Sequence, residues 1–369
     1  MIKMNFILII YILISKLISC SSSPWPKAEK VEHKIICNPS TSKLVSKFLI
    51  QRYLDARTEL GMTDASKKLF DKKVSSYYDN VDFVLLKLFG FNPEVIIFVT
   101  MKGTVIPYLR MFKCANEGIS ANLFSLTVSK STILSNGIRM NAKSNSAKDM
   151  LLNSLQHNHE YRNTTKPAFT FVREPTQRFM SGFTETVFKH VQKYNIKNSD
   201  GSNKRINESE AKDYLKQLFD FQPFLWDVEH MFPMSGAFFQ FHVPLVGSVE
   251  QMKFDWETKI KPMYGINATY NNKLGVHDTS VYHPSVVEKK GQSSRDPNGA
   301  RAAIKSVLNN DFRYSRAICQ LLLIDYVCLP MYTLPPKCMF LNDTRYAAME
   351  AIRLGHVAPR LPTAIGVHM

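Results

Sequence analysis

The segment FVREPTQRFMSGF, residues 171–183, carries residue types that bind anions. Its apolar start predicts a strand that ends at Arg173, followed by a turn at 173–178 and a helix that carries Ser181. This order places a guanidinium and a hydroxyl beside the free backbone N–H groups of a helix N-terminus, and arginine binds phosphate oxygens through paired hydrogen bonds. The segment therefore predicts a phosphate site. The alternative is an ordinary strand–turn–helix with solvated arginines.

Two buried strands are expected to position this chemistry. The runs VIIFVT (95–100) and AFTFV (168–172) are short, apolar and bounded by polar residues, which is typical of strands in the middle of a parallel sheet. Each is followed by a loop and a helical pattern. Strands that alternate with helices in this way predict an α/β fold with a central parallel sheet and helices on both faces. The expected helices are 42–60, 75–89, 105–114, 179–194, 211–220 and 300–324.

The N-terminus has the pattern of a targeting segment. Lys3 precedes an unbroken apolar run at 6–14, and Lys16 interrupts the apolar character before a cluster of small residues. Spanning a bilayer takes about twenty apolar residues, so residues 1–23 are predicted to be a signal peptide or a short signal anchor. Either one directs the chain into the secretory pathway. The rest is expected to divide into a stem at 24–39, a folded domain at 40–340 and a C-terminal tail at 341–369.

The cysteines and glycosylation sequons agree with an oxidising lumen. One or two disulfides and one free thiol are expected if cleavage removes Cys20, and the pairing stays open. No C-x-x-C motif occurs, so a structural metal site is not expected. The sequons are at Asn163, Asn207, Asn267 and Asn342, and the cysteines are Cys20, Cys37, Cys114, Cys319, Cys328 and Cys338.

The composition excludes several classes of protein. Of 369 residues, 45% are hydrophobic and 11% aromatic, so a sizeable core is expected rather than a disordered or collagen-like chain. Lys and Arg exceed Asp and Glu by 47 to 31, a net charge of +16 that favours polyanionic partners. The targeting segment argues against nucleic acid, and anionic glycans, phosphate cofactors and acidic membranes stay open as partners. Basic clusters such as Lys67–Lys68 and Lys289–Lys290 could line a glycan groove or be simply a solvated surface.

The 171–183 segment also resembles a known family. Its pattern V-R-[DE]-P-x-x-R-x-x-S-[GA]-F is similar to the 3′-phosphate-binding signature of Golgi carbohydrate sulfotransferases, which use 3′-phosphoadenosine 5′-phosphosulfate (PAPS). By this resemblance Arg173 and Ser181 hold the 3′-phosphate of the cofactor. Arg178 either contacts a phosphate or braces the loop. The resemblance implies a P-loop-like sulfotransferase topology for the sheet.

Enzymes of this family also need an earlier anion loop, which binds the 5′-phosphosulfate. The loop after the first expected strand carries Lys102, Gly103 and Thr104. Lys102 would stabilise the charge that develops on the bridging oxygen, while Thr104 and a helix N-terminus would hold the phosphate. The loop is shorter than the family's pattern, and the alternative for Lys102 is a surface lysine. The P-loop pattern G-x-x-x-x-G-K-[ST] is absent, which argues against a kinase on the same fold.

The downstream segments keep the family's order. Residues 227–252 resemble a segment with H-x-x-P-[MQ]-S followed by V-G-x-x-E, and residues 321–335 resemble its closing helix. The resemblance covers about residues 40–340. Within the family, the chain is similar in particular to a nematode branch of the chondroitin-type enzymes. The resembling residues are His230, Pro233, Met234, Ser235, Val246, Gly247, Glu250, Asp325 and Tyr326.

Sulfuryl transfer to a sugar requires a base that takes the proton from the attacking hydroxyl. His230 is the candidate, because it lies in the family's His-bearing segment; the alternative is a half-buried structural histidine. Glu174 lies next to the phosphate loop, but it could equally pair with Arg178 or sit as a carboxylate at the helix N-terminus. His277 and His283 form a further candidate pair.

The sequence therefore predicts a PAPS-dependent carbohydrate O-sulfotransferase of the Golgi lumen that acts on an anionic glycan such as chondroitin. Fixed cations and helix dipoles can carry the charge of this reaction, so no metal is expected. The membrane would be contacted only through the N-terminal segment. The alternative from another class is a secreted, catalytically degenerate relative that binds anionic glycans.

Overall fold

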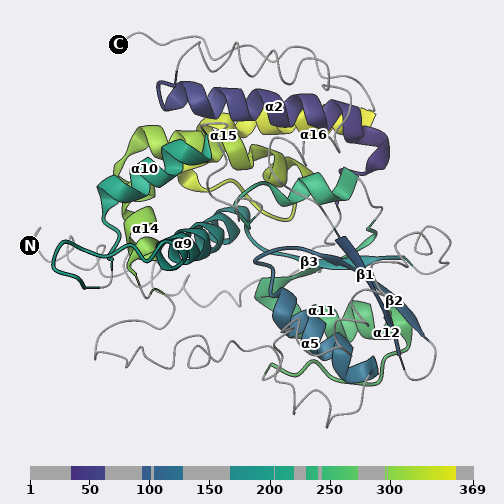
Figure 1. Ribbon diagram of the computed structural model, residues 1–369. Coiled ribbons are helices and arrows are strands. Elements are labelled where there is room, and N and C mark those ends of the chain that lie inside the picture. The colour runs from purple at the N-terminus through teal and green to yellow at the C-terminus, as the bar shows by residue number, and fades with distance from the viewer. Residues whose placement is uncertain are drawn as a thin grey trace, which may run out of the picture. The chain divides into compact units, whose positions relative to one another are not determined.

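A four-stranded sheet in the order β1-β2-β3-β4 organises the computed structural model (Figure 1). Strands β2, β3 and β4 are parallel, with Tyr108 opposite Phe169 and Phe169 opposite Leu245. Strand β1 is an edge strand that runs antiparallel to β2. The predicted parallel sheet is therefore confirmed for three strands. The strands are β1 (Glu94–Val99), β2 (Val105–Arg110), β3 (Phe169–Val172) and β4 (Leu245–Ser248).

The described part of the chain belongs to one compact unit, His33–Met369. The expected N-terminal segment at 1–23, the helix at 75–89, Lys102, Gly103, His277 and His283 lie outside the described residues. The structure describes residues 35–62, 94–100, 104–127, 167–202, 204–219, 230–239, 243–272, 296 and 298–354.

The helix expected at 105–114 is wrong, because this segment forms strand β2. A five-residue connection, 100–104, joins β1 to β2, which pairs with it in the antiparallel direction. The Thr100 N–H donates to Thr104 O (2.9 Å), and the Thr104 N–H donates to Thr100 Oγ1 (3.0 Å). A short apolar run has no periodicity that separates helix from strand, so pairing with β1 decides the outcome.

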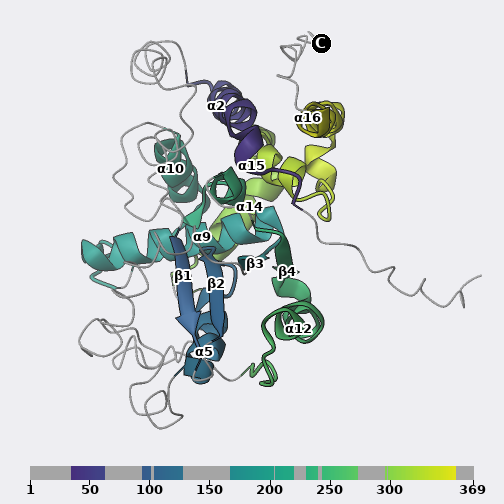
Figure 2. The same ribbon diagram turned by 90° about the vertical axis from the view of Figure 1, so that its right-hand side faces the viewer.

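Side chains of the sheet alternate between two apolar layers, as the period of a strand requires. Phe169 and Phe171 of β3 pack with Trp256 and Tyr264 on one side, whereas Val172 packs into the larger core on the other. Figures 1 and 2 show helices on both faces, as expected. The helices of the first side are α5 (Asn116–Thr127), α11 (Met252–Asp255), the π-helical turn η6 (Trp256–Ile260) and α12 (Lys261–Tyr264). Those of the second side include α2 (Ser42–Glu59), α9 (Pro175–Lys193), α10 (Glu208–Leu218), α14 (Ala300–Asn310) and α15 (Phe312–Cys328).

Several helical boundaries differ from expectation. Helix α9 begins at Pro175, inside the turn expected at 173–178, and α10 begins at Glu208. The single helix expected at 300–324 is two helices, because Asp311 is extended and caps α15 by accepting the N–H of Arg313 (3.1 Å). The first part of the segment expected to be a C-terminal tail, 341–369, forms helix α16 (Asn342–Leu354), which packs on α15. Its Arg345 donates to Tyr326 O (2.9 Å) and Tyr332 O (2.8 Å). These long-range contacts stabilise a helix that the local pattern does not predict.

Two disulfides hold the central helix α15. Cys37 pairs with Cys328, and Cys319 pairs with Cys338 of the 3-10 turn η7 (Pro336–Leu341). Cys114 is a buried free thiol. The expectation of one or two disulfides and a free thiol is confirmed for the described cysteines, and stable disulfides are typical of the secretory pathway. Within the described residues, no helix has the length and apolar character needed to cross a membrane.

Candidate functional site

Two turns at the carboxyl ends of β2 and β3 form the candidate site. Strand β2 leads through residues 111–115 into α5, and β3 leads through Arg173 and Glu174 into α9. Because β2 and β3 are parallel neighbours, the two turns lie at the same edge of the sheet. Ligands of open α/β sheets bind at this edge, where strands give way to helices.

The turn after β2 has an unusual backbone. Lys113 (φ 62°) and Ala115 (φ 57°) are both left-handed, a conformation that non-glycine residues adopt rarely and mostly in turns and functional sites. Turns with left-handed residues can direct neighbouring N–H groups toward an anion. Here the N–H of Cys114 is already used, since it donates to Met111 O (3.2 Å). Asn116 begins α5 and accepts a hydrogen bond from the Tyr108 hydroxyl (2.8 Å), which anchors the turn to β2. Lys113 is therefore a candidate anion-binding cation.

Sequence reasoning missed Lys113, because it assigned the residue to a helix. Of the loop 102–104 that was expected to bind the 5′-phosphosulfate, the structure describes only Thr104, and this residue lies at the opposite end of β2 from Arg173. Thr104 precedes β2, and a strand rises about 3.3 Å per residue, so Thr104 lies about 20 Å along β2 from the 111–115 turn. The signal that could have revealed Lys113 is a lysine directly after a β-branched and aromatic run and before a helical pattern.

The turn after β3 is capped by its own glutamate. The Glu174 carboxylate accepts the N–H of Thr176 (3.1 Å) and of Gln177 (2.7 Å), and Pro175 has no N–H. The backbone donors that the sequence offered to an anion are thus already occupied. An anion at this turn must be bound by side chains, and Arg173 and Ser181 are both partly exposed. Of the alternatives for Glu174, the structure has the helix N-terminal carboxylate.

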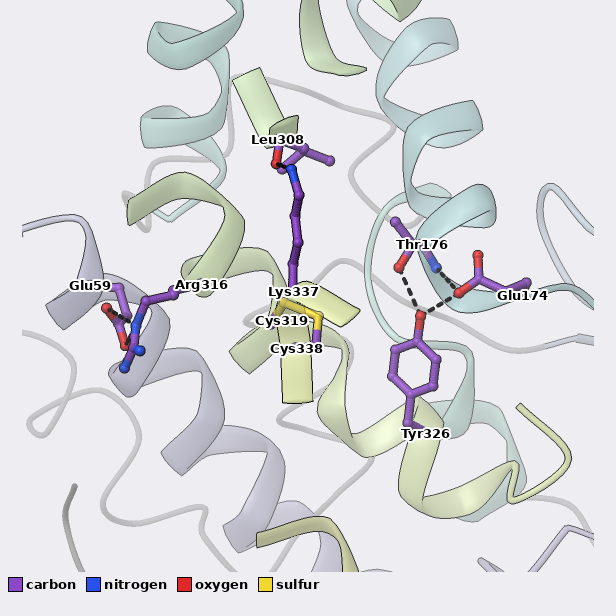
Figure 3. Close-up of a disulfide and its surroundings, with 9 residues drawn as sticks. All are labelled: Glu59, Glu174, Thr176, Leu308, Arg316, Cys319, Tyr326, Lys337 and Cys338. Atoms are coloured by element: carbon purple, nitrogen blue, oxygen red, sulfur yellow. Dashed lines mark hydrogen bonds and ion pairs between the residues drawn. A yellow bond between two sulfur atoms is a disulfide. The ribbon is translucent and has the colours of Figure 1, made fainter. Parts of the chain in front are cut away.

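A hydrogen-bond network fixes Glu174 in this position. Figure 3 shows Tyr326 of α15 pointing at the first turn of α9, where its hydroxyl donates to Glu174 and lies 2.8 Å from Thr176 Oγ1. Burial, and next the charge of Glu174, raise the pKa of Tyr326. The phenol therefore stays a neutral donor at physiological pH.

A second carboxylate holds the backbone of the same turn. Glu250 follows β4 and accepts the Glu174 N–H (3.1 Å), the Tyr332 hydroxyl (3.0 Å) and the Ser248 hydroxyl. Burial acts to raise the pKa of Glu250, but these hydrogen bonds outweigh it and lower the pKa. Glu250 is thus an ionised carboxylate that ties the β3 turn to the end of β4.

Arg178 clamps the two halves of the site together. Its guanidinium is buried, 1% exposed, and donates from Nε to Phe112 O (2.8 Å) and from Nη1 to Phe232 O. The first carbonyl belongs to the β2 turn and the second to the segment that follows His230. Of the two roles considered for Arg178, this geometry matches the brace.

His230 lies beneath the β2 turn. The residue is 5% exposed, and its ring packs against Phe112 in a tilted arrangement with 4.7 Å between the ring centroids. Burial first, and then the charges of four neighbouring cations, lower the pKa of His230 to about 2. In this environment the imidazole is a weak base. The four cations are Lys113, Lys189, Arg178 and Arg110.

Glu185 is a further residue that sequence reasoning missed. It lies one turn after Ser181 on the same face of α9. Its carboxylate forms ion pairs with Lys113 and with Lys189 (2.7 Å), and Oε1 is 3.7 Å from Nδ1 of His230. Position 185 falls four residues after Ser181, and this spacing is the only sequence signal for it.

Other residues that resemble the family have structural roles. Asp325 is fully buried and accepts the N–H groups of Met234 (3.0 Å) and Ser235 (2.8 Å), and burial raises the pKa of Asp325. Gly247 of β4 faces Phe171, whose ring would be 2.4 Å from an added Cβ. Among the residues that the structure describes, no group of His, Cys, Asp and Glu side chains is arranged to hold a metal.

The fold is α/β, with two candidate anion-binding turns at the carboxyl edge of its sheet. A family model described as "Sulfotransferase family" matches residues 97–314, from β1 into the first turn of α15. The chain therefore belongs to the sulfotransferase family. No curated protein and no solved structure matches it.

Proposed function

We propose that this protein is a PAPS-dependent carbohydrate O-sulfotransferase of the Golgi lumen, of the chondroitin type. The observation that carries the proposal is the pair of turns at the ends of β2 and β3. They bring Lys113 and Arg173 to one edge of the sheet. Membership of the sulfotransferase family and the two disulfides support the reaction and the compartment.

The residues at this edge fit a cofactor with two anionic ends. Arg173 and Ser181 would hold the 3′-phosphate, in line with the signature at 171–183. Lys113 and the left-handed 111–115 turn would hold the 5′-phosphosulfate. When bound, PAPS supplies the sulfuryl group, whose bond to the bridging phosphate oxygen breaks as a bond to the sugar oxygen forms. Lys113 would donate a hydrogen bond to that leaving oxygen and stabilise its charge.

His230 is the proposed base that takes the proton from the sugar hydroxyl. Its low pKa reflects burial and the nearby cations. A bound anion would offset these charges and raise the pKa of His230 toward its ordinary value. The role of His230 as base therefore depends on an occupied cofactor site.

The acceptor is proposed from charge. The net charge of +16 favours an anionic glycan such as chondroitin over a neutral one. Fixed cations suffice for the chemistry, so neither a metal nor nucleic acid is proposed as a partner. Membrane contact is proposed only for the segment at 1–23.

A sulfate-transfer assay tests this proposal. The full chain, expressed through a secretory pathway, would be incubated with radiolabelled PAPS and with chondroitin, dermatan, heparan and desulfated glycans. Transfer to one acceptor class is expected, and Arg173→Ala or Lys113→Ala should reduce it at least a hundredfold, the scale of a lost transition-state contact. Lys102→Ala is the matched control, because it removes a lysine from the other loop. Absence of transfer, together with absence of 3′,5′-ADP binding in calorimetry, would overturn the proposal.

One observation favours the alternative, a degenerate relative that binds anionic glycans. His230 is 5% exposed and has a pKa near 2, which suits a structural histidine. Such a protein would be retained on a column that carries the anionic glycan, and it would transfer no sulfate. Binding of 3′,5′-ADP separates the two candidates, since a degenerate relative has no need of the cofactor.

A further inference from the structure

The cations of the candidate site are neutralised in part by Glu185. Its two carboxylate oxygens are divided between Lys113 and Lys189, from the β2 turn and from the next turn of α9. The side chains of Lys113 and Glu185 are 17% and 28% exposed, so both can exchange partners with a ligand from solvent. Partly exposed ion pairs of this kind are weak. A phosphate-type anion that reaches the 111–115 turn can therefore displace Glu185 from Lys113.

Among the described residues, His230 is a further partner within reach of Glu185. His230 is held by its ring contact with Phe112 and by the close approach of its backbone to Gly182. Its Nδ1 is buried without a hydrogen-bond partner and lies 3.7 Å from Glu185 Oε1. A small rotation of the carboxylate would bring this pair into hydrogen-bond range.

We propose that Glu185 is a positioning residue that pairs with Lys113 while the anion site is empty and turns to Nδ1 of His230 once an anion has taken Lys113. This exchange rests on the proposed function, because it concerns the same site. A carboxylate on Nδ1 holds the proton there and leaves Nε2 free to accept one. The arrival of the cofactor and the readiness of the base would then be linked.

Glu185→Gln tests the exchange, because the variant is expected to bind 3′,5′-ADP more tightly and yet to transfer sulfate more slowly. Binding of 3′,5′-ADP, measured by calorimetry, should become two- to tenfold tighter, since the anion no longer competes with a carboxylate for Lys113. The kcat of sulfate transfer should fall about tenfold, since His230 loses its orienting partner, and KM for PAPS should fall with Kd. A merely structural role for Glu185 would weaken binding and activity together.

Glu257→Gln is the matched control. Glu257 is 28% exposed like Glu185 and forms the same i,i+4 ion pair, with Lys261 (2.9 Å), on the other side of the sheet. This variant removes the same charge, so equal tightening in both variants would point to net charge and overturn the proposal. Equal or weaker binding in Glu185→Gln, with wild-type binding intact, would also overturn it and leave the proposed function standing. A wild-type chain that binds no 3′,5′-ADP would instead refute the proposed function, and the exchange with it.

If Glu185→Gln does not fold, a measurement on the wild-type chain still tests the exchange. With histidines labelled with nitrogen-15, addition of 3′,5′-ADP should produce the NMR signature of an Nδ1-protonated, hydrogen-bonded imidazole for His230. A His230 spectrum that does not change at saturating 3′,5′-ADP would contradict the exchange.

Discussion

Gly182 of α9 lies directly against the backbone of His230. A Cβ at this position would be 2.1 Å from the His230 carbonyl oxygen and 2.6 Å from its carbonyl carbon. The glycine that follows Ser181 is therefore required by packing. It allows the helix that carries Arg178 and Glu185 to approach the histidine segment.

Gly182→Ala should destabilise the protein by about 1–3 kcal/mol, because the contact is with backbone and one element must move. Chemical denaturation measures this effect. Ser181→Ala, one residue earlier and partly exposed, is the control and should change the free energy of unfolding by less than about 1 kcal/mol. Equal stability of Gly182→Ala and wild type would show that α9 can shift freely.

Arg178→Met should cost about 3 kcal/mol or more, since it removes a buried cation and leaves the carbonyls of Phe112 and Phe232 without their donor. Arg178→Lys should rescue little, because an ammonium cannot reproduce the two directed hydrogen bonds. Urea unfolding and 3′,5′-ADP binding would be measured on the same samples. A variant with wild-type stability and lost binding would identify Arg178 as a ligand rather than a brace.

Glu174→Ala should lower stability by about 1 kcal/mol, the usual effect of removing an N-cap. It also frees the N–H groups of Thr176 and Gln177. Asn207→Ala is the control. It removes the side chain that caps α10 by accepting the Glu210 N–H (3.0 Å), and so it shows what the loss of a cap away from the candidate site costs in stability. If Glu174→Ala is no less stable than wild type, the hydrogen bonds to Glu174 add nothing to folding.

Glu250 should make stability depend on acid pH. Its pKa is lowered in the folded protein, so its contribution is present above the ordinary value of 4.5 and is lost as pH falls through the folded value. Glu250→Gln should therefore be less stable than wild type at pH 7, by about 1–2 kcal/mol, and the difference should shrink at pH 3. Thermal unfolding at both pH values measures it, and a difference that stays constant would contradict the assignment.

The two disulfides should differ in their effect. In the chain-entropy description, the loop of 291 residues between Cys37 and Cys328 stabilises by about 5 kcal/mol, and the loop of 19 between Cys319 and Cys338 by about 3 kcal/mol. Cys37→Ser should therefore lower the Tm more than Cys338→Ser. The reverse order would indicate that the Cys319–Cys338 disulfide, which holds η7, stabilises the protein more than the Cys37–Cys328 disulfide does.

Much of this protein follows from its sequence. The pattern at 171–183 predicts β3, the helix after it and the pair Arg173 and Ser181, because the strand, the turn and the helix are all local features. The strand at 95–100 and the helix at 42–60 are predicted for the same reason. The cysteine content and the targeting segment predict one or two disulfides and a free thiol, whereas the pairing and the burial of Cys114 come from the structure.

Only the tertiary structure decided the other half of the site. The segment after Thr104 is a strand because it pairs with β1, and this strand leads into the 111–115 turn that carries Lys113. Glu185, Lys113 and His230 come from segments far apart in the chain, and they meet because β2 and β3 are neighbours and Arg178 clamps their turns. Local propensity covers a few residues, whereas the contacts that build this cluster join residues 45 to 118 positions apart. The sequence therefore determined the local structure of one turn, and the fold assembled its partners.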